Sequence, residues 1–76
     1  MRRKNVRTAI KMLPQYCPDA TKEEVDACIK GAQNKLDMII KREGNLQGVR
    51  LNPSYLSMLL AEQIKQRRVI LNLCHA

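Results

Sequence analysis

The chain has 76 residues, enough for one domain, and a domain of this size buries only about 60% of the surface that its unfolded form exposes. Two tyrosines are its only aromatic residues, so leucine, isoleucine, valine and methionine must fill the core, which favours helices. The formal net charge is +7, and no apolar run approaches the roughly 20 residues that span a bilayer, which argues against a membrane protein.

The first predicted helix runs from Arg3 or Lys4 to Leu13. Pro14 ends it, because a proline disfavours helical geometry in the residue before it. One face of this helix is apolar and carries Val6, Ala9, Ile10 and Leu13. One flank is basic and carries Arg3, Lys4, Arg7 and Lys11.

The second predicted helix covers residues 22–43. Thr21 and Glu24 form the sequence pattern of a capping box, and Gly44 supplies a stop at the other end. Acidic residues follow the cap, and Lys41 and Arg42 lie near the C-terminus, as the helix dipole favours. A continuous apolar stripe is formed by Val25, Cys28, Ile29, Ala32, Leu36, Ile39 and Ile40.

The third predicted helix starts at Pro53, with Asn52 as its cap, and runs to about Leu73. Its apolar stripe consists of Leu56, Leu59, Leu60, Ile64, Ile70 and Leu71, and a back strip consists of Tyr55, Met58, Val69 and Leu73. A helix that is apolar on both sides is usually buried on both sides. We expect one side to meet the second helix in an antiparallel hairpin and the other to meet the first helix or another subunit.

The connection between the second and third helices spans residues 44–51. A helix-turn-helix motif for DNA binding needs a shorter turn of about 3–4 residues, which argues against that reading. We therefore expect an all-α protein with a short N-terminal helix and a long antiparallel helical hairpin, assembled as a homo-oligomer because cores this small often need a second subunit.

Arg67 falls in the middle of the apolar stripe of the third helix. The hairpin register places it opposite Gly31 and Ala32, where there is no acidic residue to pair with it. Two explanations stay open. Its stem covers apolar neighbours while its guanidinium reaches water, or it binds an anion supplied by a ligand or another subunit. Arg68 lies at the edge of the stripe, and we expect it to matter less.

The chemistry of a metal site or an enzyme is not evident in this sequence. Cys17, Cys28, Cys74 and His75 lack the closely spaced ligand pairs of structural zinc sites, and we expect neither a metal nor a cofactor. The single histidine has no second positioned group with which to form a catalytic pair. We expect no enzymatic activity.

The three cysteines are odd in number and contain no Cys-x-x-Cys pair, which favours the reducing cytoplasm over a secreted disulfide scaffold. The N-terminal segment has no apolar stretch of the kind that secretory signals carry. It is rich in arginine and free of acids, so a mitochondrial presequence stays an alternative to a cytoplasmic protein.

The positive charge is concentrated at the two ends of the chain. Residues 1–18 carry five basic residues and no acid, and residues 45–76 carry four against one, whereas residues 19–44 carry five against six. This distribution favours an anionic partner, although small domains commonly carry a net charge of about 2–8 for solubility alone. Two tyrosines are too few for a platform that stacks the bases of a single strand.

We therefore expect a non-enzymatic binding protein that holds a nucleic-acid backbone or a nucleotide on a basic helical surface. The alternative is a small helical inhibitor or adaptor, of the kind that mobile elements encode, which docks on an acidic protein. The candidate ligand-binding residues are Arg3, Lys4, Arg7, Lys11, Lys65, Arg67 and Arg68.

Overall fold

The protein is built from helices alone in the part that the structure, a computed structural model, describes: residues 3–43 and 53–75. The elements in chain order are α1 (Arg3–Met12), the short 3-10 helix η1 (Leu13–Gln15), α2 (Lys22–Glu43) and α4 (Pro53–His75). The expected all-α class is confirmed, and the two long helices pack against each other.

The helix starts and stops follow local signals in the sequence. The first helix gives way to η1 at Leu13, next to Pro14, and the Leu13 carbonyl accepts hydrogen bonds from the backbone N–H groups of Tyr16 and Cys17 at 2.9 and 2.8 Å. The second helix has the predicted bounds, and the third continues two residues beyond the predicted end at Leu73. The stop at Gly44, the connection over residues 44–51 and the cap at Asn52 lie outside the described residues.

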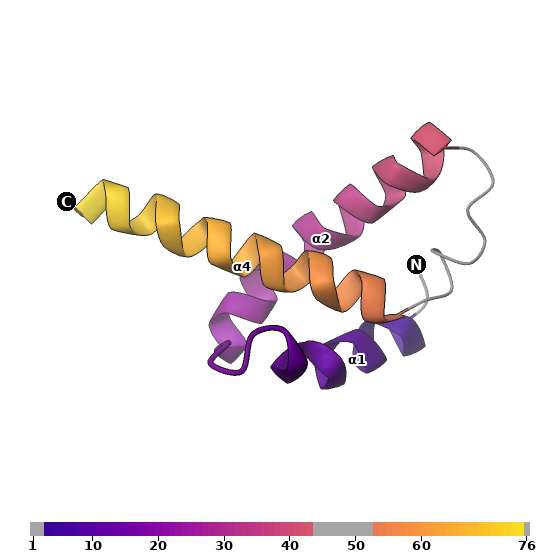
Figure 1. The fold of residues 1–76 in the computed structure, drawn as a ribbon, viewed down its shortest axis with the longest axis horizontal. Coiled ribbons are helices and arrows are strands. Elements are labelled where there is room, and N and C mark those ends of the chain that lie inside the picture. Colours follow the sequence, from indigo (N-terminus) through magenta and orange to yellow (C-terminus); the bar gives the residue numbers. More distant parts are fainter. Residues whose placement is uncertain (1–2, 44–52, 76) are drawn as a thin grey trace.

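Helix α4 is the central element. Both α2 and α1 pack mainly on α4, and they make fewer contacts with each other. Figure 1 shows α2 crossing α4 obliquely in the opposite direction, while α1 runs beside α4 in the same direction. The expected antiparallel hairpin is therefore present, with α1 as a third element against α4.

The core lies along the N-terminal two-thirds of α4. Leu56, Leu60 and Ile64 are completely or almost completely buried, and Leu36 of α2 packs into the same cluster. The other buried apolar members of the cluster are Ala9, Leu13, Cys17, Cys28, Ala32, Leu59 and Ala61. Most of the predicted stripe residues therefore face the core. Ile10 is the exception on α1, with 38% of its surface exposed.

The last turns of α4 are not part of this core. Ile70 and Leu71 are 60% and 38% exposed, so α2 covers only part of the predicted apolar stripe within the chain. The reason is the position of α2, whose first turn already lies level with Arg68, so that α2 does not extend along the last turns of α4. Figure 1 shows this end of α4 projecting beyond the other helices.

The back strip of α4 is also largely uncovered within the chain. Val69 and Leu73 are 57% and 72% exposed, Met58 is exposed as well, and Tyr55 is half-buried. On the helical wheel, the side of α4 that carries Ser57 and Ala61 also carries Arg68, whose side chain reaches the segment after η1. Helix α1 therefore covers that side of α4 and leaves the back strip open.

Ser57 is the one buried polar residue among the described parts of the chain, and its hydroxyl has no hydrogen-bond partner there. We predict that Ser57→Ala raises the free energy of unfolding by about 1 kcal/mol, because the change removes an unsatisfied buried hydroxyl while keeping the small size. Alanine also has the higher helix propensity. Urea unfolding followed by circular dichroism measures the change, and a clear destabilisation would mean that the hydroxyl is bonded in the folded protein.

Candidate functional site

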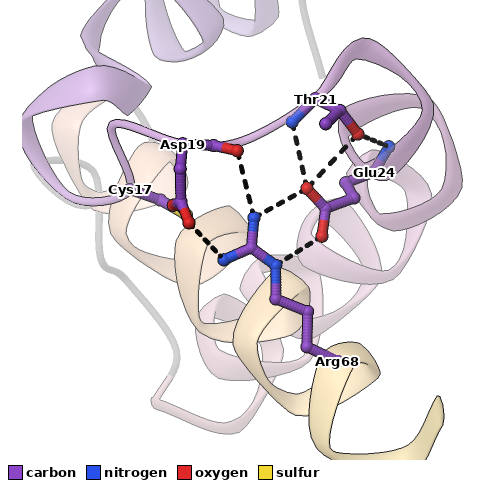
Figure 2. Close-up of polar contacts among 5 residues, drawn as sticks. All are labelled: Cys17, Asp19, Thr21, Glu24 and Arg68. Atoms are coloured by element: carbon purple, nitrogen blue, oxygen red, sulfur yellow. Dashed lines mark hydrogen bonds and ion pairs between the residues drawn. The ribbon is translucent and has the colours of Figure 1, made fainter. Parts of the chain in front are cut away.

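In the described part of the chain, Arg68 donates four hydrogen bonds from the side of α4 that faces the start of α2. Its Nη2 donates to Oε1 of Glu24 at 2.7 Å, and its Nε donates to Oε2 of the same carboxylate. Two parallel hydrogen bonds between a guanidinium and a carboxylate are the strongest geometry available to this ion pair. Figure 2 shows the two groups facing each other.

The same guanidinium also holds the segment that leads into α2. Its Nη1 donates to Oδ2 of Asp19 at 3.1 Å, and its Nη2 donates to the backbone carbonyl of Asp19 at 3.2 Å. The other carboxylate oxygen of Asp19 accepts a hydrogen bond from the Cys17 thiol at 3.4 Å. Arg68 therefore ties α4 both to α2 and to the segment between η1 and α2 (Figure 2).

Glu24 has a second partner in the predicted capping box, which is confirmed. The backbone N–H of Thr21 donates to Oε1 of Glu24 at 3.0 Å, and the backbone N–H of Glu24 donates to the Thr21 hydroxyl at 3.2 Å. The carboxylate of Glu24 thus caps its own helix and binds Arg68 at the same time. The sequence pattern revealed only the first of these roles.

These contacts shift the titration of both carboxylates. The hydrogen bonds from Arg68, followed by the one from the Thr21 backbone, lower the pKa of Glu24 to about 2. The pKa of Asp19 is also lowered, first by the hydrogen bond from the Cys17 thiol and then by Arg68. Both groups therefore stay ionised at neutral pH, and the charge of Arg68 is compensated inside the chain.

Arg67 has no such partner, although its place in the apolar stripe suggested the larger role. It is half-buried and makes no ion pair with any described acidic residue. It lies with Gly31 and Cys28 along a hollow of about 250 Å³ between α2 and α4, close to where the hairpin register placed it. Because its neighbours Ile70 and Leu71 are exposed, its position does not require a buried anion.

Two other candidates lie on the exposed flank of α1. Arg7 and Lys11 are both exposed, and neither is paired with an acid in the described part of the chain. Arg3 and Lys4 belong to the first turn of the same helix, but their side chains lie outside what the structure describes.

Lys65 of α4 is also exposed and lies near the end of η1. It is close enough to Cys17 for its charge to act on the thiol, although burial raises the pKa of that thiol overall. The structure thus brings Lys65 toward the segment after α1. The hollow that Arg67 lines holds no other basic residue.

The described residues contain no group of three or more His, Cys, Asp and Glu side chains placed to hold a metal ion. Within the same ranges, no helix combines the length and the apolar character that crossing a bilayer requires. Cys17 and Cys28 are free, buried thiols. Comparisons with protein-family models, with curated proteins and with solved structures give no match.

The two neighbouring arginines make a matched pair for substitution. We predict that Arg68→Met lowers the free energy of unfolding more than Arg67→Met does, because it leaves the nearly buried carboxylate of Glu24 without its partner. Arg67→Met removes no ion pair, and methionine fills the same space as the stem. Urea unfolding of the two variants measures the difference, and equal losses would contradict the structural role of Arg68.

The low pKa of Glu24 also predicts how the stability of the fold changes at acidic pH. The folded pKa is about 2, whereas an unperturbed glutamate titrates near about 4.3, so the stabilisation is complete above the unfolded pKa and is lost as the pH falls toward 2. We expect Arg68→Met to lose less stability than the unmodified chain between about pH 5 and about pH 2. Urea midpoints across this range test it, and parallel pH curves for the two proteins would count against the ion pair.

Proposed function

We propose that this protein is a non-enzymatic nucleic-acid-binding protein that contacts the phosphate backbone through the basic flank of α1. The observation that carries the proposal is that Arg7 and Lys11 are exposed on one flank of a helix without any acidic residue and have no ion-pair partner in the described structure. Cations that are not compensated within the chain are the ones that can replace the counterions of a phosphate backbone.

The contrast with Arg68 supports this choice of residues. The guanidinium of Arg68 already binds Glu24 and Asp19, so we assign this residue a role in the fold and not in ligand binding. Arg67 and Lys65 also have no ion pairs among the described residues, but Arg67 lies on the α2 side of α4, away from the flank of α1. The sequence adds Arg3 and Lys4 to the same flank of α1.

A backbone is a better candidate than a free nucleotide because the cations are spread along helices. A nucleotide site needs polar groups that converge in a concave pocket. The hollow lined by Arg67 is otherwise bordered by uncharged side chains, and it lies on the α2 side of α4. Few aromatic residues are present for stacking or base reading, so the proposed contact is electrostatic and independent of sequence. The buried free thiols of Cys17 and Cys28 support a reducing, cytoplasmic setting for it.

The test is a fluorescence-anisotropy titration of a labelled DNA duplex over a range of salt concentrations. We predict that the double variant Arg7→Gln/Lys11→Gln binds more weakly and that the slope of log K against log salt falls in magnitude by about 2, because each lost phosphate contact contributes about 0.9. The unmodified protein is expected to bind unrelated duplexes with similar affinity.

The matched control is Lys41→Gln/Arg42→Gln, which removes the same charge from exposed positions at the C-terminal end of α2. It should leave the salt slope nearly unchanged. Equal slopes for the two double variants would show that net charge alone is responsible and would contradict a role for α1. An absence of binding at about 50 mM salt would refute the proposal and favour an acidic protein as the partner.

A further inference from the structure

The C-terminal end of α4 carries an apolar surface that no described part of the chain covers. Val69, Ile70 and Leu73 are each more than half exposed. On the same face, Lys65, Gln66, Val69 and Ile70 enclose a shallow hollow of about 360 Å³ between their side chains. Leu73 lies one helical turn beyond Val69 on this face. We call these five residues, 65, 66, 69, 70 and 73, the terminal face of α4.

This surface has the parts of a self-complementary contact. A hollow made by four residues of one helix accepts a side chain that projects from a facing helix, and the terminal face supplies both the hollow and the projecting leucine. In a contact with twofold symmetry, the same patch provides both sides. If two α4 helices cross in opposite directions with Val69 at the centre, Leu73 of each copy lies against the hollow of the other.

We propose that the terminal face of α4 packs against the same face of a second copy of this chain, in an antiparallel crossing centred near Val69. Apolar residues that are exposed in one chain are then removed from water in the pair. The proposal rests on a different surface from the flank of α1, so it stands or falls independently of nucleic-acid binding.

The charges of the chain favour the antiparallel crossing over the parallel one. Each copy carries a net charge of +7, so a contact must keep the cations of the two copies apart. The antiparallel crossing puts Lys65 opposite Leu73 of the second copy, whereas a parallel one would put Lys65 beside Lys65. The charge of Arg68 is already compensated by Glu24 and Asp19, so this residue does not repel its counterpart across the contact.

The contact is small. A standard stable interface buries about 800 Å² on each partner, and one end of one helix offers less than that. We therefore expect a monomer–dimer equilibrium that depends on concentration rather than a permanent dimer. This is a more limited assembly than an obligate oligomer.

Sedimentation equilibrium of the full chain from about 1 to about 500 µM tests the proposal. We expect the average mass to rise from 8.7 kDa toward twice that value with concentration. Leu73→Lys should raise the dimer Kd by at least about tenfold. The control is Met38→Lys, which adds the same charge at a residue of α2 that is 63% exposed and outside the terminal face. Circular dichroism verifies that both variants stay helical.

A cross-linking experiment tests the register of the contact. Val69→Cys is introduced together with Cys74→Ser, since Cys17 and Cys28 are buried. A residue on the twofold axis brings its two Cα atoms near the 4.4–6.8 Å that a disulfide requires, so we expect an interchain disulfide in an oxidising glutathione buffer. Met38→Cys in the same background should not form one.

Any one of three other results would overturn the proposal. A single species of 8.7 kDa at all concentrations would show that the second copy does not bind. A dimer that Leu73→Lys and Met38→Lys weaken equally would place the contact elsewhere. A dimer that Leu73→Lys weakens but that Val69→Cys does not cross-link would contradict the crossing at Val69.

Discussion

The ion pair between Arg68 and Glu24 fixes where the start of α2 lies along α4, and therefore how far the core extends along that helix. It joins the last third of α4 to the first turn of α2, and through Asp19 it also holds the segment after η1. Because α2 begins at this level, the core cannot extend farther along α4. The side chain of Glu24 is only 12% exposed, so its charge needs the guanidinium and the helix cap that it binds. The buried part of α4 and its projecting end meet at this contact.

The helices themselves could be predicted because their boundaries depend on local chemistry. Thr21 and Glu24 cap α2 through hydrogen bonds between residues three apart, and Pro14 limits α1 through its own ring. The apolar stripes likewise follow from the helical period. The side of α4 that meets α1 was not predicted, because α1 covers the side that carries Ser57 and Ala61 and leaves the predicted back strip exposed. The helix bounds and the apolar stripes could be predicted without knowing where two helices cross.

The roles of Arg67 and Arg68 could not be ranked from the sequence for the same reason. A helical wheel gives the direction of a side chain, but it does not show how far the neighbouring helix extends. The helical wheel groups Arg67 with Ile70 and Leu71 as core residues. In the structure both of these neighbours are exposed, because α2 does not extend along the last turns of α4. Glu24 had a sufficient local explanation as a capping residue, which concealed its contact with Arg68. The signal in the sequence that could have revealed this contact was the presence of two acidic residues, Asp19 and Glu24, around the start of one helix and of an arginine on the next helix.

The two proposed surfaces, the basic flank of α1 and the terminal face of α4, would act together in a dimer. The cations left uncompensated on α1, Arg7 and Lys11, lie on a helix that runs in the same direction as α4 (Figure 1). An antiparallel contact between the ends of two α4 helices would therefore place the two α1 flanks at opposite ends of the pair. Two weak phosphate-binding surfaces that are joined in this way bind one long duplex more tightly than either does alone, provided that the duplex spans both. Dimerisation and electrostatic binding would then strengthen each other, because a ligand that binds the pair better than the single chain also stabilises the pair.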